Sequence, residues 1–324
     1  PQFADAVINR SYALLMNEDY AAGWIVYERR FDAGAMAARG FPYPPWQGEP
    51  LAGKRILIYA EQGLGDEIMF ASCVPDMLDL AEHCVIECNS RLARLFQRSF
   101  ARAHVHGAEK NTDRNWLAQL PRIDVQIAIG SLPRFLRRAR AEFSACRGYL
   151  AADARRAEYW RNQFSAGSAL RVGIAWRGGT LRSRQFTRSI DLPQWLPVLK
   201  SEGAAFYSLQ YGEIATEVES MRVKSGVTVT HLGAAVDDID ELAAIISALD
   251  LVISVDNTVA HLAGALGKPV WTLLPCSPEW RYPRQGEQMP WYPSMRLFHR
   301  ARGDAWGLVL DRVAAELAVA ARVK

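Results

Sequence analysis

A polar corner at Asp256-Asn257-Thr258 has the residue types and the setting that bind anions. It follows an unbroken, largely β-branched run at residues 251–255, which predicts a strand buried on both faces of a parallel sheet. Small residues after the corner predict a helix, and the corner supplies the side chains that cap it. The free backbone N–H groups at the start of this helix carry the positive end of its dipole. The corner therefore predicts a phosphate site. A capped helix without a ligand explains the segment equally well.

A second polar loop follows the strand expected at residues 170–176. Arg177 comes directly after this strand and precedes Gly178-Gly179, so its guanidinium is free to donate two parallel hydrogen bonds to a phosphate. Parallel strands end at the same edge of a sheet. This loop and the Asp256 corner therefore predict one diphosphate pocket.

Basic side chains beside these two segments have more than one interpretation. Arg188 is assigned to a cleft loop, whereas Arg182 and Arg184 are interpreted as solvated loop charges. His261 lies one turn into the helix after the corner. Its imidazole either contacts the same ligand, or packs within the domain or faces solvent.

A glycine-rich turn follows the strand expected at residues 54–60. The word Glu61-Gln62-Gly63-Leu64-Gly65-Asp66-Glu67 resembles a dinucleotide fingerprint, but the third glycine of that motif would fall on Ile68. Its three acids would also repel a pyrophosphate. A carboxylate at a helix N-terminus that faces a cleft is suited to accept a proton from a hydroxyl group, so Asp66 is the candidate general base. The alternative is that Asp66 only caps the helix.

The composition limits the classes of protein and partner. The 324 residues are 50% hydrophobic and 23% charged, which is enough for two or three globular domains. A net charge of +3 argues against a general polyanion binder. The basic run at residues 134–147 has too few aromatic residues for a single-strand binder, so we interpret it as a solvated helix face and expect no nucleic-acid partner.

No metal site is predicted. Asp238-Ile239-Asp240 spells DxD, a metal-binding word in other proteins. It directly precedes a helix expected at residues 241–248, where acids are favoured in the first turn. The sequence also contains no cluster of His and Cys with the spacing of metal ligands.

The cysteines and the hydropathy favour a cytoplasmic protein. Cys73, Cys84, Cys88, Cys146 and Cys276 form no CxxC pair and are odd in number, which indicates reduced thiols. Cys84 and Cys88 share one strand face and are expected in the core. No stretch reaches the roughly 18–20 apolar residues of a membrane span, and no leader is expected at the start.

The predicted elements divide the chain into four parts. Residues 1–40 predict a helical hairpin, and a Pro-rich linker at residues 41–50 begins the next part. Residues 41–155 and 156–305 each alternate strands with helices, so each predicts an α/β unit with a parallel sheet. Residues 306–324 predict an amphipathic helix that crosses back onto the first α/β unit. The cleft between two such units is the expected ligand site. The strands are expected at residues 54–60, 84–88, 104–106, 125–129, 170–176, 205–209, 227–230, 251–255 and 270–274.

These motifs, in this order, resemble a known family. Residues 17–30 resemble the last unit of a tetratricopeptide array. The chain as a whole resembles glycosyltransferases of GT-B fold, in the bacterial tetratricopeptide-linked branch similar to the heptosyltransferases and to O-linked protein glycosyltransferases. The matching words are Glu61-Gln62-Gly63-Leu64-Gly65-Asp66, Gly173-Ile174-Ala175-Trp176, Arg188-Ser189-Ile190, Ser208-Leu209-Gln210, residues 254–269 and Trp280-Arg281-Tyr282.

The resemblance implies an α/β fold of two Rossmann-like domains that face a cleft, preceded by a tetratricopeptide-like helical hairpin. It implies an acceptor domain at residues 41–155 and a nucleotide-sugar-binding domain at residues 156–305. Asp66 maps to the general base. The acceptor side or cleft loops map to Glu61, Gln62, Gly63, Gly65 and Arg188, and donor binding maps to Arg177, Gln210, Asp256, Asn257, Thr258 and His261. Many relatives have Asp-Thr where this chain has Asp256-Asn257-Thr258, which leaves the hydroxyl contact open.

The resemblance also implies a reaction and its partners. The reaction is an inverting, metal-independent transfer from a nucleotide-sugar, in which a helix dipole and an arginine stabilise the leaving phosphate. No cofactor is expected besides this donor substrate. Because tetratricopeptide helices usually recruit polypeptides, a protein such as flagellin is the expected acceptor. The alternatives are transfer onto lipopolysaccharide or another surface glycan, and a non-catalytic adaptor that binds a sugar nucleotide or a peptide.

Overall fold

The computed structural model describes residues 4–32, 39–109, 113–143, 148–164, 167–179 and 185–323. The chain divides into two compact units. The first consists of Pro1–Ala145 together with Glu279–Arg284, and the second of Cys146–Pro278 and Gln285–Lys324. Arg182, Arg184 and residues 144–147, which include Cys146 and the end of the basic run interpreted above, lie outside the described residues.

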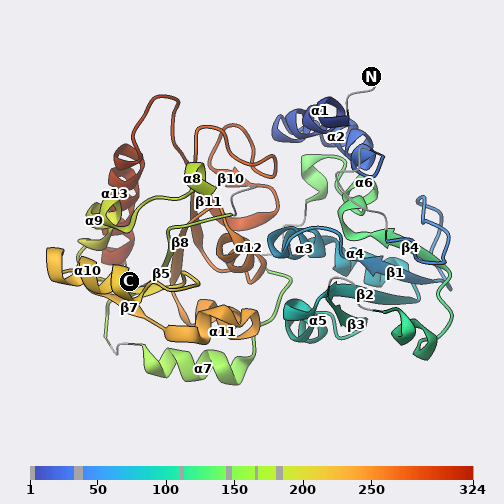
Figure 1. The fold of residues 1–324 in the computed structure, drawn as a ribbon, viewed down its shortest axis with the longest axis horizontal. Coiled ribbons are helices and arrows are strands. Elements are labelled where there is room, and N and C mark those ends of the chain that lie inside the picture. The colour runs from blue at the N-terminus through green and yellow to red at the C-terminus, as the bar shows by residue number, and fades with distance from the viewer. Residues whose placement is uncertain are drawn as a thin grey trace. The chain divides into compact units, whose positions relative to one another are not determined.

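The first unit joins a helical hairpin to an α/β layer. Its four strands form a parallel sheet in the order β3-β2-β1-β4, in which the chain starts in the middle and winds outward to both edges. The hairpin helices α1 and α2 pack side by side (Figure 1). The elements are α1 (Ala4–Met16), α2 (Tyr20–Tyr27), β1 (Arg55–Tyr59), α3 (Leu64–Phe70), α4 (Val74–Leu80), β2 (His83–Asn89), α5 (Ala93–Ser99), β3 (His104–Ala108), β4 (Val125–Ala128) and α6 (Pro133–Leu136).

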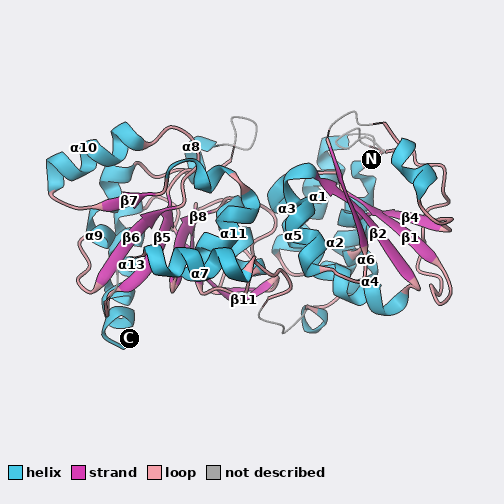
Figure 2. Ribbon diagram, turned by 90° about the horizontal axis from the view of Figure 1, so that it is seen from below, coloured by secondary structure: helices cyan, strands magenta, loops and turns pink. Residues whose placement is uncertain are grey.

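The second unit contains a seven-stranded sheet in the order β10-β11-β9-β8-β5-β6-β7. Figure 2 labels β5, β6, β7, β8 and β11 of this sheet. All neighbouring strands are parallel except the pair β10 and β11. The elements are α7 (Ala154–Gln163), β5 (Leu170–Ala175), α8 (Gln185–Arg188), α9 (Leu196–Leu199), β6 (Ala204–Ser208), α10 (Ala215–Ser225), β7 (Val229–His231), α11 (Ile239–Ala248), β8 (Leu251–Val255), α12 (Thr258–Ala265), β9 (Val270–Leu274), β10 (Gln288–Met289), β11 (Tyr292–His299) and α13 (Trp306–Val323).

The central strands are buried as their sequences predict. Every residue of β8 is buried, and so are Ile56, Leu57 and Ile58 in β1. Cys84 and Cys88 are both buried in β2, which confirms that they share a core-facing position. Parallel strands that are covered on both faces require such continuous apolar runs.

Helix α13 corrects one prediction. Its buried residues Val309, Leu310 and Val313 belong to the hydrophobic core of the second unit, together with Trp195 of the short 3-10 turn before α9. The helix also contacts α9 and β11 of that unit. The prediction that residues 306–324 cross back onto the first unit is therefore wrong. An amphipathic pattern specifies that a helix has a buried face, but not which sheet that face covers.

The hairpin and a distant segment both belong to the first unit. The hairpin forms one compact unit with the first α/β layer, and so does Glu279–Arg284, which the chain reaches between β9 and β10. The return of these six residues to the first unit was not predicted from the sequence. Strands β10 and β11 were not predicted either.

The basic run at residues 134–147 is not a uniformly solvated face. Arg137 is buried, and its guanidinium donates to the carbonyl oxygen of Ser72 at 3.0 Å and to Asp76 at 2.7 Å. Among the described residues, no helix combines the length and the apolar character needed to cross a bilayer.

Candidate functional site

The candidate base Asp66 lies in the first turn of α3, directly after the strand β1. The helix begins at Leu64, and its N-cap residue Gly63 has no side chain that could cap it. The Asp66 carboxylate instead binds Arg281: the Nε atom donates to Oδ1 at 2.6 Å, and a terminal nitrogen also contacts Oδ1. The prediction that Asp66 only caps the helix is therefore wrong. Both of these contacts engage Oδ1, so Arg281 leaves Oδ2 of Asp66 unoccupied.

Arg281 is supported by an aromatic cluster on the hairpin. Its guanidinium lies 5.0 Å from the ring centroid of Trp280. Trp280 in turn stacks on Tyr12 of α1, with 5.6 Å between centroids and 6° between planes, and packs at 5.2 Å from Tyr27 of α2. The backbone N–H of Arg284 donates to the last carbonyl of α1, on Met16, at 3.1 Å. The hairpin and the segment 279–284 therefore hold the arginine that binds the candidate base.

Glu61 anchors the same hairpin to the turn after β1. Its carboxylate accepts from Arg30 at 2.7 and 3.0 Å, and both side chains are only 1% exposed. It also accepts from the backbone N–H of Gly130, at 3.1 Å, in the loop after β4. Burial opposes the charge on Arg30, but the ion pair and hydrogen bond with Glu61 raise the pKa of its guanidinium above the ordinary value.

The neighbouring Gln62 has a similar role. Its Nε2 atom donates to the hydroxyl oxygen of Tyr27 at 2.7 Å. The turn residues assigned to the acceptor side thus tie the turn to the hairpin, because Glu61 and Gln62 both point toward it. Gly63 and Gly65 lie at the start of α3, where Gly63 is exposed and Gly65 is partly buried.

Two further acids lie buried behind Asp66. Glu67 accepts a hydrogen bond from the backbone N–H of Asn89 at 2.8 Å, and burial raises its pKa to about 7. Burial also raises the pKa of Glu87, although Arg39 contacts its carboxylate. Glu67 is buried whereas Asp66 is only partly buried, a difference that the spacing of the acids in the turn did not predict.

In the second unit, the loop after β5 and the corner after β8 meet as predicted. Asn257 is the N-cap residue of α12: its Oδ1 accepts from Ala260 N–H at 3.2 Å, and its Nδ2 donates to the carbonyl oxygen of Arg177 at 3.1 Å. A Cβ atom on Gly178 would lie 2.4 Å from the carbonyl oxygen of Asp256. Only glycine permits this close approach. The two segments therefore form one rim at the carboxyl edge of the sheet.

The charged groups of this rim are paired. Arg188 donates to Asp256 at 3.0 Å, and both side chains are buried. Arg188 was assigned to the acceptor side or a cleft loop. The structure places it in the second unit, beside the Asp256 corner that was assigned to donor binding. Arg177 donates to Glu217 of α10 at 2.7 Å and remains 35% exposed, so its guanidinium is accessible to a ligand.

The remaining predicted donor residues shape this rim. Gln210 is buried after β6, and its Oε1 accepts from the N–H groups of Trp176 and Arg177 at 3.1 and 2.8 Å. Thr258 is partly exposed as the first residue of α12. His261 is buried one turn later, with its Nδ1 atom 2.9 Å from the hydroxyl oxygen of Tyr292. The buried position of His261 agrees with the alternative that its imidazole packs within the domain. Arg177 and Thr258 remain accessible to a ligand.

Other polar features have structural roles. The Asp238 side chain caps α11 by accepting from the N–H groups of Asp240 and Glu241 at 2.8 and 3.2 Å, as the position before a helix predicts. Within the described ranges, no group of three His, Cys, Asp or Glu side chains could hold a metal ion.

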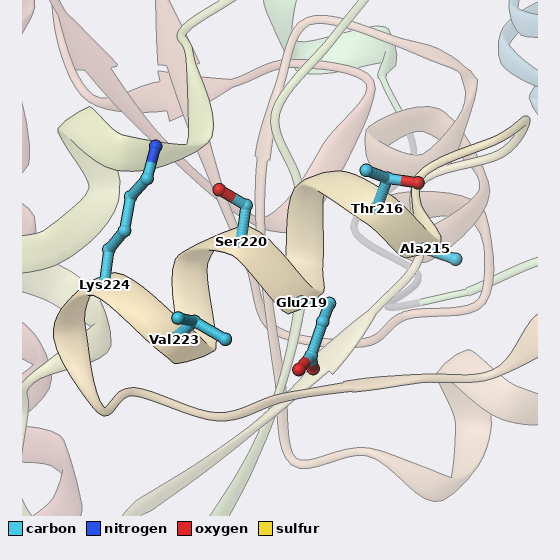
Figure 3. Close-up of a pocket in the computed structure, with 6 residues that line it drawn as sticks. All are labelled: Ala215, Thr216, Glu219, Ser220, Val223 and Lys224. Atoms are coloured by element: carbon cyan, nitrogen blue, oxygen red, sulfur yellow. The ribbon is translucent and has the colours of Figure 1, made fainter.

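Two hollows in the described part of the chain are lined by none of the predicted site residues. One runs along α10 and is lined by that helix alone, and Figure 3 shows Glu219 and Lys224 pointing to opposite sides of it, so these side chains do not converge on a ligand. The other is a cavity of about 330 Å³ in the first unit, beside the carboxyl ends of β1 and β4. Its lining includes Glu28, Trp46, Tyr59 and Phe135. The order of the strands reverses between β1 and β4, and open α/β sheets bind ligands at a reversal of this kind.

Comparison with known proteins matches one segment of the chain to a family of enzymes. Residues 212–303 match the family described as Glycosyltransferase family 9 (heptosyltransferase). Protein FlbA from Caulobacter vibrioides is 33% identical over 333 residues, which cover 98% of this chain. The match covers 54% of FlbA, so the chain spans about half the length of this curated relative.

Two solved structures share the fold over most of their length. The glycosyl transferase family 9 protein from Veillonella parvula has a TM-score of 0.59 at 11% identity, covering 86% of this chain and 98% of that chain. The ADP-heptose lps heptosyltransferase II of E. coli has a TM-score of 0.59 at 14% identity, covering 83% of this chain and 99% of that chain. The predicted α/β fold with parallel sheets is confirmed, whereas the tetratricopeptide assignment of the hairpin stays a prediction. The chain has the GT-B-like fold of these glycosyltransferases and contains a segment that matches family 9.

Proposed function

We propose that this chain is an inverting, metal-independent glycosyltransferase that moves a sugar from a nucleotide-sugar donor to an acceptor hydroxyl. The observation that carries the proposal is the rim of the second unit, where Asn257 joins the Arg177 loop to the start of α12. An accessible guanidinium beside a helix N-terminus is suited to bind a diphosphate. The shared fold and the family 9 segment support the same reaction.

In the proposed reaction, Oδ2 of Asp66 accepts the proton of the acceptor hydroxyl. The oxygen of that hydroxyl then forms a bond to the anomeric carbon of the donor, while the bond between this carbon and the diphosphate oxygen breaks. Attack opposite to the leaving group inverts the configuration. Arg177 and the first turn of α12 stabilise the negative charge that develops on the leaving diphosphate.

ADP-heptose is the first donor to test, because the E. coli neighbour with the same fold is named for it. A panel of sugar nucleotides can be screened by thermal shift, since a ligand that binds only the folded chain raises its melting temperature. A donor that stabilises wild type but not Arg177→Ala would support the proposed pocket. Absence of a shift with every donor would contradict it.

We propose a protein acceptor, with flagellin as the first candidate. The support is the resemblance of residues 17–30 to a tetratricopeptide unit and the exposed Ile25 on α2, which is 62% accessible. A surface glycan is the second candidate, because the E. coli neighbour is named as an lps heptosyltransferase. Transfer of labelled sugar to purified flagellin and to truncated lipopolysaccharide, run in parallel, separates the two acceptors. Binding of donor without turnover in either assay would indicate an adaptor.

A further inference from the structure

We propose that Arg281 is a positioning residue for the candidate base Asp66, and that the helical hairpin holds it in place through Trp280. The inference rests on the proposed function, because it assigns a role in that reaction. It gives the hairpin a task inside the first unit in addition to any recruitment of an acceptor.

The contacts of Arg281 fix one oxygen of the Asp66 carboxylate. Two nitrogens of the guanidinium converge on Oδ1, and Glu279 lies 3.8 Å from a third nitrogen, Nη1. Arg281 and Asp66 are 15% and 13% exposed, so little water competes for these contacts. A carboxylate held by one oxygen presents the other in a defined direction, which is what proton transfer to a positioned base requires.

The aromatic contacts explain why Arg281 stays there. Trp280 is 7% exposed and lies between Tyr12 and Tyr27 of the hairpin and Phe70 at the end of α3. Burial raises the pKa of the Tyr12 phenol, Arg281 lowers it and Asp66 raises it further, so this ring lies within electrostatic reach of the ion pair. Loss of the Tyr12 ring should therefore loosen Trp280 and, through it, the arginine.

The first experiment compares steady-state transfer by wild type, Arg281→Ala and Arg281→Lys. Arg281→Ala should lower kcat about 100-fold, the scale of a misplaced reacting group, and leave the donor KM unchanged. Arg281→Lys should recover part of the loss. Added methylguanidinium should also restore part of the kcat of Arg281→Ala, because it can occupy the vacated guanidinium site beside Asp66. It would not repair a merely structural defect. Arg102→Ala is the matched control, since Arg102 forms an exposed ion pair with Asp79 in the same unit.

The second experiment tests the hairpin without relying on activity. Hydrogen exchange of the full chain should become faster at residues 63–70 and 279–284 in Tyr12→Ala, but not in Tyr12→Phe or Arg102→Ala. Unchanged exchange in Tyr12→Ala would overturn the role of the hairpin.

The outcomes separate this inference from the proposed function. If wild type transfers sugar and Asp66→Ala does not, but Arg281→Ala has the wild-type kcat, the positioning role fails and the proposed function stands. If wild type neither binds nor transfers any donor, the proposed function fails. The exchange comparison then decides alone whether the hairpin holds the segment.

Discussion

Glu61→Gln should destabilise the first unit strongly, because Glu61 is half of a buried ion pair. Arg30 and Glu61 are both 1% exposed and share two hydrogen bonds at 2.7 and 3.0 Å. The substitution leaves the buried Arg30 charge with Glu28, at 2.7 Å, as its remaining acidic partner, and the loss of Glu61 costs up to about 3–5 kcal/mol. Stability of a domain is typically about 5–15 kcal/mol, so this loss is large. At about 2–4 °C per kcal/mol for a unit of this size, the unfolding temperature of the first unit should fall by roughly 6–20 °C.

Differential scanning calorimetry of the full chain measures this shift. Glu219→Gln is the matched control, because its partner Arg222 is exposed on α10, and its transition should stay at the wild-type temperature. The double variant Arg30→Met/Glu61→Met removes both buried charges, so it should be more stable than Glu61→Gln alone. If Glu61→Gln unfolds at the wild-type temperature, or if the double variant is no more stable than the single one, Glu61 does not stabilise the unit by neutralising a buried charge.

Three further predictions concern a buried acid, the diphosphate rim and a helix cap. Burial raises the pKa of Glu67 from 4.5 to about 7, so the folded chain keeps a proton that the unfolded chain releases. The free energy of unfolding should therefore fall as the pH rises through this range. In urea titrations, Glu67→Gln should remove about 2–3 kcal/mol of this loss between pH 5 and 8. Arg177→Ala should weaken donor binding by roughly 10–100-fold in calorimetric titrations, since a charged hydrogen bond contributes about 1.5–3 kcal/mol, and equal affinity would remove Arg177 from the pocket. Asn257→Ala should lower the free energy of unfolding by about 1 kcal/mol through the lost cap on Ala260 N–H, and a urea midpoint equal to that of wild type would rule out this role.

Local patterns predicted the parts of the fold that local physics determines. The β-branched run of β8 and the capping types at Asp238 and Asn257 specify a buried strand and two helix starts without reference to distant residues. The common rim of Arg177 and the Asp256 corner followed from the rule that parallel strands end at one edge.

Distant pairings could not be predicted in this way. Asp66 and Arg281 are 215 positions apart, and the word Trp280-Arg281-Tyr282 carried no signal of which carboxylate it would meet. Arg137 belongs to a charged run typical of a solvated face, yet the fold buries it against Ser72 and Asp76. Amphipathic patterning likewise did not say which sheet α13 would cover. Burial and ion-pair partners depend on packing, which the sequence specifies only through the whole fold.

The most direct test of the account is the rate of sugar transfer by Asp66→Asn at saturating donor, measured beside its affinity for the same donor. General base catalysis contributes about 10²–10⁴-fold, so the account predicts a loss of rate on this scale with donor affinity unchanged. Transfer at the wild-type rate by Asp66→Asn would contradict the account.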